Sequence, residues 1–449
     1  MVLTANNSRV FPRQFNHDYP SAARGEGAYL FDTTGKAYLD ASGGAAVSCL
    51  GHGHPRVIAA IKAQLDKIAF AHTSFFTNET TEELAQFLTD RAPAGFGRVY
   101  FLSGGSEAND TAMKLARQVH LERGHVERSH YIARHQSYHG NTVGTLSLSG
   151  YPARRAPFEP ILLPNISHIA PCYAYRHQHG DESLEQYGLR AAGELEIEIL
   201  RVGPDKVAAF FAETVVGSTL GAVCAAPGYF REIRRICDKY DVFMVLDEVM
   251  SGMGRTGNLF ACLAEGVVPD MISIAKGLGG GYQPISALMV RDDLVETIES
   301  GSGAFMHGHT YIGHATACSA ALAVQKIIDE ENLLERVQRI GARVQDVLVQ
   351  RLSAHQHVGD IRGRGLFLGV EFVQDKVTKR PFPRANKIAA RLKKTAQENG
   401  LICYPDCGTV DGKDGDHVML APPFILPEEA IDELVDKLAR SIDQVLGMD

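Results

Sequence analysis

The sequence lacks the features that mark membrane proteins and nucleic-acid-binding proteins. Its 449 residues contain no run of Lys or Arg and carry a formal net charge of −8 at pH 7. A nucleic-acid partner requires a basic face that neutralises phosphates, so we expect no such partner. No segment approaches the roughly 18 uninterrupted apolar residues of a membrane span, and the amino terminus lacks a basic start followed by an apolar stretch. We therefore expect a cytoplasmic protein without a membrane partner.

The eight cysteines lack the short, repeating spacings of a disulfide framework, and we interpret them as reduced thiols. Cys403 and Cys407 could approach each other in a loop, but a single pair is a weak sign of a metal site. The 18 histidines include no H-E-x-x-H pattern. We interpret them as loop and capping residues and expect no metal.

The length of the chain predicts two domains, because a single core stops growing at a smaller size. Between about residue 55 and about residue 310, apolar runs alternate with helical periodicity, which is typical of an α/β layer with a mostly parallel sheet. The runs "DKVAAFFAETV", "DVFMVLDEV" and "DMISIAK" have the composition of strands that are buried on both faces.

The last 120 or so residues predict a compact α+β unit. They contain a long amphipathic helix whose apolar stripe includes Val344 and Val347, further helices and short strands. The amino-terminal hairpin over residues 27–41 is expected to complete this unit. The predicted division is 1–54 for an amino-terminal segment of the small domain, 55–315 for the large domain and 316–449 for the small domain.

Polar residues end four of the apolar runs, namely Ser103, Glu213, Asp247 and Lys276. Ligands of open α/β sheets bind beyond the carboxyl ends of the strands. We therefore expect these four side chains to converge on one crevice.

The segment "SGGSEAND", residues 103–110, reads as a glycine turn that opens a helix. Free backbone N–H groups at such a turn could bind an anion, most naturally a phosphate. An ordinary loop with Ser106 as the helix cap is the alternative. The segment is neither a Walker A loop nor G-x-G-x-x-G, so ATP and NAD are not favoured.

Asp247 ends a buried strand, where a carboxylate needs a cationic or hydrogen-bonding partner. In one interpretation, Asp247 and Glu248 cap a loop or pair with Arg255. In the other, Asp247 keeps a buried ring nitrogen protonated, which makes that ring a better electron sink.

Lys276 stands directly after an apolar run and directly before glycines. Its side chain could snorkel to solvent, or desolvation could keep it as a neutral amine that forms a Schiff base. An anion cradle, a buried carboxylate and such a lysine together are what pyridoxal phosphate requires.

Five segments in this order strongly resemble the class III aminotransferases, and the likeness extends from residue 27 to residue 423. They are "SGGSEANDTAMKLAR", "YHG", "LDEVMSGMGRTG", "ISIAKGLGGGYQP" and "GHTYIGHATACSAAL". The resemblance implies an α/β fold of type I, the fold of aspartate aminotransferase, with a large domain around a mostly parallel sheet and a smaller α+β domain. It implies pyridoxal 5'-phosphate as the cofactor.

The resemblance also implies roles for individual residues. Lys276 would form the Schiff base and move the proton, and Asp247 would pair with the pyridinium nitrogen. Gly105 and Ser106 would hold the phosphate, and Thr310 would reach the phosphate of a second subunit. A homodimer, which could pair further into a tetramer, is therefore implied.

Three further residues would surround the cofactor ring. Tyr138 would stack on one face and Val249 would lie on the other, although Tyr138 could also be a core or interface tyrosine. Glu213 would lie near the cofactor hydroxyl, where relatives often pair it with a mobile arginine.

One departure from the family concerns substrate recognition. Met419 stands about where relatives that act on α-amino or 4-amino acids carry an arginine, and residues 401–417 contain no arginine at all. The segment "HVMLAPP" resembles the branch that acts on amines and ω-amino acids with pyruvate as acceptor. Either another basic residue binds the acceptor carboxylate, or the pocket selects amines with little carboxylate.

The expected function is a ping-pong transaminase that passes an amino group from a small amine or ω-amino acid to a keto acid such as pyruvate. A decarboxylase, racemase or aminomutase of the same fold is an alternative. A catalytically silent protein that binds pyridoxal phosphate is a third.

Overall fold

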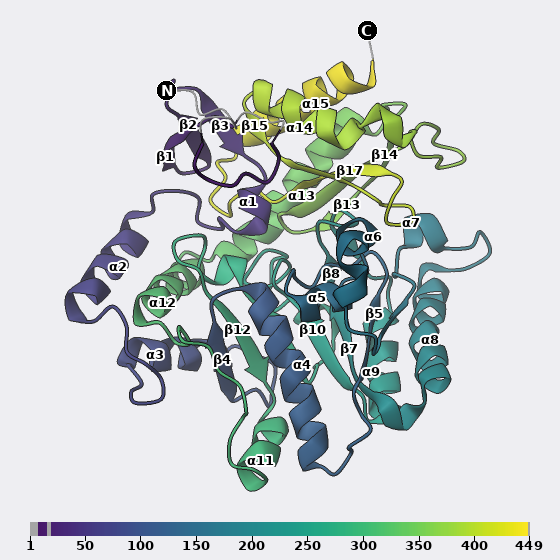
Figure 1. Ribbon diagram of the computed structural model, residues 1–449. Coiled ribbons are helices and arrows are strands. Elements are labelled where there is room, and N and C mark those ends of the chain that lie inside the picture. Colours follow the sequence, from purple (N-terminus) through teal and green to yellow (C-terminus); the bar gives the residue numbers. More distant parts are fainter. Residues whose placement is uncertain (1–7, 16–18, 448–449) are drawn as a thin grey trace.

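The computed structural model describes residues 8–15 and 19–447. Residues 1–7 and 16–18, which belong to the predicted amino-terminal segment 1–54, lie outside the described residues. Two regions lie one above the other in Figure 1, a larger one around a seven-stranded sheet and a smaller one around two four-stranded sheets. None of the described helices is both long enough and apolar enough to cross a membrane.

The large sheet is mostly parallel, as the sequence predicts. Its strands lie in the order β4 (Arg98–Leu102), β12 (Ser286–Val290), β11 (Met271–Ile274), β10 (Phe243–Asp247), β7 (Val207–Glu213), β5 (His130–Arg134) and β6 (Ile166–Ile169). Only β12 among them runs antiparallel to its neighbours. All residues of β7, β10 and β11 are buried, which explains their uninterrupted apolar composition.

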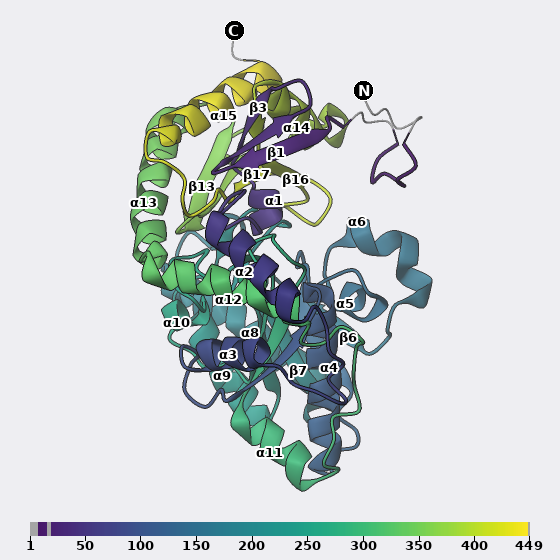
Figure 2. The same cartoon turned by 90° about the vertical axis from the view of Figure 1, so that its left-hand side faces the viewer.

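Helices cover both faces of this sheet (Figures 1 and 2). Phe210 of β7 packs with residues of α8 and α9, whereas its neighbour Phe211 packs with residues of α4 on the other face. The helices of this region are α2 (Pro55–Lys67), α3 (Glu79–Thr89), α4 (Gly105–Glu122), α5 (Val143–Leu148), α6 (Pro152–Arg155), α7 (Ala174–His177), α8 (Leu184–Val202), α9 (Tyr229–Tyr240), α10 (Cys262–Glu265), α11 (Asp292–Ser300) and α12 (Ala315–Glu330). Shorter elements are η1 (Ala156–Ile161), η2 (Pro204–Lys206), η3 (Lys276–Leu278), β8 (Val215–Val216) and β9 (Val223–Cys224).

The smaller region combines both ends of the chain. One sheet has the order β1 (Ala22–Glu26), β2 (Tyr29–Asp32), β3 (Ala37–Asp40) and β15 (Leu401–Ile402), so the predicted hairpin pairs with a strand from far along the sequence. The other has the order β13 (Val358–Arg364), β14 (Phe367–Phe372), β17 (Asp416–Leu420) and β16 (Tyr404–Cys407). Its helices are α1 (Gly43–Ala46), η4 (Arg384–Asn386), α13 (Leu333–Leu352), α14 (Ile388–Glu398) and α15 (Ala430–Leu446).

Helices α12 and α13 connect the two regions. Ala321 of α12 belongs to the core of the large sheet, whereas Val324 of the same helix belongs to the core of the smaller region. Figure 2 shows α13 rising from α12 along one side of the smaller region. On α13 the sequence placed Val347 in the apolar stripe, but the structure buries Leu348 and leaves Val347 half-buried, because 3.6 residues per turn carry the buried face past position 347.

Candidate active site

A cavity of about 160 Å³ lies beyond the carboxyl ends of β7, β10 and β11. It brings together seven of the eight predicted site residues and five more. The lining residues are Gly105, Ser106, Asn109, Tyr138, His139, Gly140, Glu213, Val215, Asp247, Val249, Met250 and Lys276. Parallel strands place their ends at one edge of the sheet, and this explains why residues from five parts of the chain meet here. We call Asp247, Glu213 and Lys276 the floor of this crevice.

Asp247 is held by a hydrogen-bonded network. Its Oδ2 accepts from Asn109 Nδ2 at 2.8 Å and lies 2.9 Å from His139 Nδ1, and its Oδ1 accepts from the Val249 N–H at 3.0 Å. Asn109 in turn accepts from the Ser273 hydroxyl at 2.7 Å. These partners satisfy the hydrogen-bonding capacity of a buried carboxyl group and fix its orientation.

Sequence reasoning missed His139 and Asn109 as functional residues. His139 was interpreted as a loop or capping histidine, although its place beside Tyr138 in "SYHG" was a signal for it. The suggested pairing of Asp247 or Glu248 with Arg255 is wrong. Arg255 donates to the carbonyl oxygens of Leu366 and Pro422, and Glu248 accepts from backbone N–H groups of the loop before α10.

Lys276 begins η3, separated from the end of β11 by one residue, and has a φ of 45°, an unusual conformation for a residue with a Cβ. Burial lowers the pKa of its ammonium to about 8, although the charges of Asp247 and Glu213 act in the opposite direction. The positive charges of Arg154 and Arg255 lower the pKa further. A substantial fraction of this amine is therefore neutral near pH 8, so the snorkelling interpretation does not describe it.

Glu213 connects the floor to Tyr138. Its Oε1 accepts from the Tyr138 N–H at 3.0 Å, and its Oε2 accepts from the Gly217 N–H at 2.8 Å. Burial raises the pKa of this carboxyl, and the nearby charge of Asp247 raises it further. Within residues 8–15 and 19–447, its partners are these N–H groups and not the arginine that relatives often use.

The first turn of α4 offers an anion site. Gly104 is the N-cap and no side chain caps this helix, so the interpretation of Ser106 as a cap is wrong. Ser106 Oγ instead lies 3.2 Å from both the Oδ1 and the backbone N of Asn141. The free N–H groups of the turn and the positive end of the helix dipole favour a phosphate.

Glycines at this turn are required by close contacts. A Cβ on Gly105 would lie 2.9 Å from Val249 Cγ1, and a Cβ on Gly140 would lie 2.6 Å from Ser106 Oγ. Gly104 has ordinary extended backbone angles, φ −150° and ψ 155°, so the turn does not require a special backbone conformation at this glycine. The glycines keep the space beside Ser106 open.

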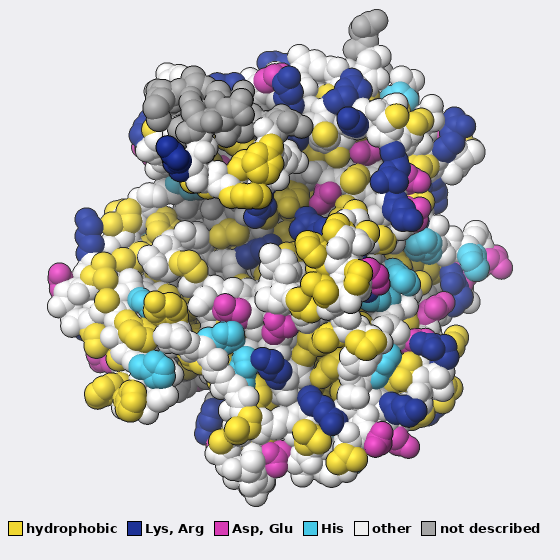
Figure 3. Space-filling model, viewed as in Figure 1, with side chains coloured by type: hydrophobic (Ala, Val, Ile, Leu, Met, Phe, Trp, Pro, Cys, Tyr) yellow, Lys and Arg dark blue, Asp and Glu magenta, His cyan; other side chains and the backbone are white. Residues whose placement is uncertain are grey.

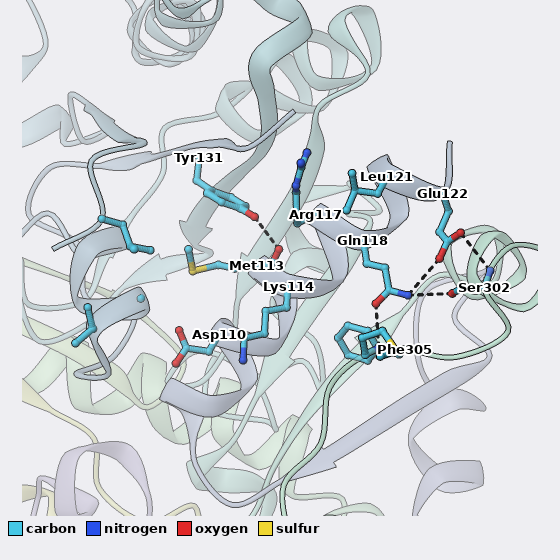
Figure 4. A pocket seen from close by; sticks show the side chains of 14 residues that line it. Asp110, Met113, Lys114, Arg117, Gln118, Leu121, Glu122, Tyr131, Ser302 and Phe305 are labelled. Atoms are coloured by element: carbon cyan, nitrogen blue, oxygen red, sulfur yellow. Dashed lines mark hydrogen bonds between the residues drawn. The ribbon is translucent and has the colours of Figure 1, made fainter. Parts of the chain in front are cut away.

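Thr310 does not line this cavity. It is exposed on the loop between α11 and α12. Figure 4 shows how residues 302–306 of this loop are tied to the outer face of α4: Gln118 Nε2 donates to Ser302 Oγ at 3.2 Å, and Gln118 Oε1 accepts from the Met306 N–H at 2.9 Å. The larger cavity there, about 870 Å³, is lined by none of the floor residues and lies apart from the predicted chemistry.

Met419 lies in β17 and is fully buried beside Phe367, Val215 and Met250. Val215 and Met250 also line the crevice, so the wall of the crevice beside Met419 is apolar. Figure 3 shows that Lys and Arg side chains nevertheless lie in the hollow between the two regions.

The residues present fit pyridoxal phosphate. The crevice contains the Lys276 amine, whose pKa is lowered, and the Asp247 carboxyl group, which could pair with a protonated ring nitrogen. It also contains the uncapped start of α4, which could bind a phosphate, and the Tyr138 ring, which could stack on the cofactor. Glycines leave the phosphate position free of Cβ atoms. No other cofactor considered for this sequence requires this combination.

The fold is similar to that of an (S)-enantioselective omega-transaminase from Thermomicrobium roseum. The two chains are 35% identical with a TM-score of 0.92, and the match covers 99% of this chain and 98% of the other. Fold and crevice together define a pyridoxal-phosphate-dependent transferase of fold type I, as the sequence predicted.

The family follows from the sequence comparisons. The model of the family "Aminotransferase class-III" matches residues 12–442. An uncharacterised aminotransferase of Schizosaccharomyces pombe is 48% identical over 432 residues, which are 96% of this chain and 94% of that protein. Gamma aminobutyrate transaminase 3, chloroplastic, of Solanum lycopersicum is 38% identical over 427 residues, 93% of this chain and 79% of that protein. The chain belongs to the class III aminotransferases; it is an aminotransferase, and its cofactor is pyridoxal 5'-phosphate.

Proposed function

We propose that the protein is a ping-pong transaminase that passes an amino group from an amine or ω-amino acid to a keto acid such as pyruvate. The observation that carries this proposal is the convergence of Lys276, Asp247, Glu213, Tyr138 and Ser106 on one cavity. The similarity to an omega-transaminase and to a gamma-aminobutyrate transaminase supports donors whose amine is remote from any carboxylate.

Each floor residue has a role in this proposal. Pyridoxal phosphate, when bound, supplies the carbon that receives the amino group and the ring that withdraws electrons. The Lys276 amine attaches the cofactor and carries the proton between the two carbon atoms that exchange it, which its lowered pKa favours. The Asp247 carboxylate holds the ring nitrogen protonated.

The residues around the floor orient the cofactor. The start of α4, with Gly105 and Ser106, binds the phosphate. Tyr138 and Val249 would enclose the ring of a bound cofactor from its two faces, and Glu213 would lie near the ring hydroxyl. The hydrogen bond from the Tyr138 N–H to Glu213 supports this placement, because it fixes the backbone that carries the stacking side chain.

The proposal includes a homodimer, or a pair of dimers, in which Thr310 reaches the phosphate of the partner subunit. The exposure of Thr310 on a loop that is anchored to α4 supports this, as do the exposed apolar side chains Phe75, Phe76, Met306 and Tyr311. Light scattering after size-exclusion chromatography tests it, and an active monomer contradicts it. The cytoplasmic location stays a prediction.

A donor screen with pyruvate fixed as the acceptor tests the proposed function. 1-Phenylethylamine, β-alanine, putrescine and taurine cover aromatic amines, carboxylate donors, diamines and sulfonates. We expect one alanine to appear for each donor consumed, with parallel lines in double-reciprocal plots. Loss of carbon dioxide or donor isomerisation without alanine would instead indicate the decarboxylase, racemase or aminomutase alternatives. Failure of every donor to convert the bound cofactor to its amine form would indicate a silent protein.

A further inference from the structure

The crevice has an exposed arginine at its mouth that the roles above do not use. Arg154 is the third residue of the four-residue helix α6, and its guanidinium carbon lies 4.9 Å from the centre of the Tyr138 ring. It lies 5.8 Å from the centre of the Tyr151 ring as well. The side chain is exposed, so a substrate that enters the crevice can reach it.

Arg154 lies beside residues 401–417, the segment that contains no arginine. Tyr404 and Asp406 of β16 lie close enough to act on its charge, and both raise the pKa of its guanidinium against the effect of burial. Tyr404 packs against the apolar cluster of Met419 and Val215, and Val215 also lines the cofactor cavity. We call Arg154 and Tyr404 the mouth of the crevice.

The two sides of the mouth are tied together by hydrogen bonds. The Tyr151 hydroxyl donates to the Cys407 carbonyl oxygen at 2.9 Å. Gln136 Nε2 donates to the carbonyl oxygens of Gly408 and Thr409 at 2.8 and 2.9 Å. These contacts hold α6 against the end of β16. The packing of the fold therefore sets the position of Arg154 relative to residues 401–417.

The charge of Arg154 is available to a ligand. Among residues 8–15 and 19–447, no carboxylate lies within ion-pair distance of it, whereas Arg155 next to it donates to the carbonyl oxygens of Ser147 and Ser149. Its positive charge is also felt at Lys276, where it lowers the pKa of the amine. A guanidinium binds a carboxylate through two parallel N–H···O bonds, a geometry that an ammonium cannot offer.

We propose that Arg154 binds the substrate carboxylate at the mouth of the crevice, in place of the arginine that residues 401–417 lack. This inference rests on the proposed function and selects between its two open alternatives: the substrates are α-keto acid acceptors and ω-amino acid donors, both of which carry one carboxylate. Arg154 is therefore a specificity-determining residue on the large-sheet side of the crevice, whereas Lys276 carries the chemistry.

The test compares substrates with and without a carboxylate. The amine form of the holoenzyme is mixed with pyruvate or with butanal, and the absorbance of the cofactor gives the apparent dissociation constant of each. In Arg154→Gln we expect this constant to rise at least about tenfold for pyruvate and to change less than about twofold for butanal, because only pyruvate loses a charged hydrogen-bonding partner. The apparent dissociation constant of Arg154→Lys for pyruvate should lie between those of Arg154→Gln and the unsubstituted protein.

A second measurement does not depend on turnover. Calorimetry of the holoenzyme with propionate, an unreactive carboxylate, should show an affinity that Arg154→Gln lowers by a similar factor. Arg13 is the matched control, because its positive charge also acts on Tyr138. Arg13→Gln should leave the dissociation constants for pyruvate and propionate within about twofold of those of the unsubstituted protein.

Three results would overturn the inference. The first is that Arg154→Gln leaves the dissociation constants for pyruvate and propionate unchanged, and the second is that it weakens the binding of butanal as much as that of pyruvate. The third is that Arg13→Gln alone weakens the binding of pyruvate and propionate by the factor expected for Arg154→Gln. A different result would show that the proposed function itself is wrong. In that case the unsubstituted protein yields no amine form with any donor, whereas propionate binding still reports on Arg154.

Discussion

The floor of the crevice is built from the ends of buried strands, whereas its mouth is built from a four-residue helix and an edge strand. Asp247 at the floor is fixed by Asn109, His139 and the Val249 N–H. Arg154 at the mouth is exposed and rests against aromatic rings. A rigid, desolvated floor suits chemistry on one constant cofactor, and an accessible mouth suits two different substrates that must enter in turn.

Among substitutions at the floor and the mouth, we expect the one at Lys276 to lower turnover most. Lys276→Ala removes the amine that moves the proton, so turnover should fall by up to about 10⁴-fold. Steady-state alanine formation and the visible absorbance of the holoenzyme measure the effect. The control is Lys394→Ala, which removes an exposed lysine of α14. An active Lys276→Ala variant would contradict the role of the floor.

Asp247→Asn should have the next largest effect. An amide cannot hold the ring nitrogen protonated, and the loss of one preorganised electrostatic contact typically costs about 10²–10³ in rate. Single-turnover rates at matched cofactor content measure this, with Asp346→Asn on the exposed side of α13 as the control. A rate within tenfold of the unsubstituted protein would mean that Asp247 only stabilises the fold.

The pH dependence of cofactor attachment should follow Lys276. The neutral amine is the reactive form, and the lowered pKa of about 8 means that its fraction rises about tenfold per pH unit below pH 8 and levels above it. Stopped-flow addition of pyridoxal phosphate to the cofactor-free protein between pH 6 and pH 10 measures the profile. A rate that keeps rising through pH 10 would show an ordinary, solvated lysine.

Asn109→Ala should have the smallest effect at the floor. It removes one hydrogen bond to the Asp247 carboxylate, worth about 1.5–3 kcal/mol, so the rate should fall by about 10- to 100-fold. Ser273→Ala, which removes only the bond that orients Asn109, should cost less. Equal losses in the two variants, with equal losses in thermal stability, would point to disruption of the core instead.

Much of the floor could be predicted because short apolar runs that end in polar residues define strand ends. Glu213, Asp247 and Lys276 were each placed at such an end, and the parallel sheet brings them together. His139 and Asn109 could not be found this way, because a hydrogen bond across 108 or 138 residues of sequence leaves no local pattern. The predicted domain division at residues 54 and 315 and the role of Thr310 in a partner subunit stay predictions.

The apolar stripe of α2 shows the limit of periodicity. Val57, Ile58, Ile61, Leu65 and Ile68 stand at helical spacing and predict one apolar face. The structure buries Val57, leaves Ile61 half-buried against the core of the smaller region, and leaves Ile58, Leu65 and Ile68 exposed. Periodicity identifies the helix correctly but does not say what covers its apolar side. That depends on the elements that pack against it.

The sequence by itself determined the alternation of strands and helices, because that depends on local composition. It also determined the cofactor, because short motifs in a fixed order carry the resemblance to the family. The role of Lys276 at that cofactor stays a prediction. Only the tertiary structure decided which groups hold Asp247 and which arginine faces the substrate. Arg154 and Tyr404 are 250 residues apart in sequence, and the packing of α6 against β16 alone makes them neighbours. An arginine missing from one segment was therefore no evidence that the crevice lacks one.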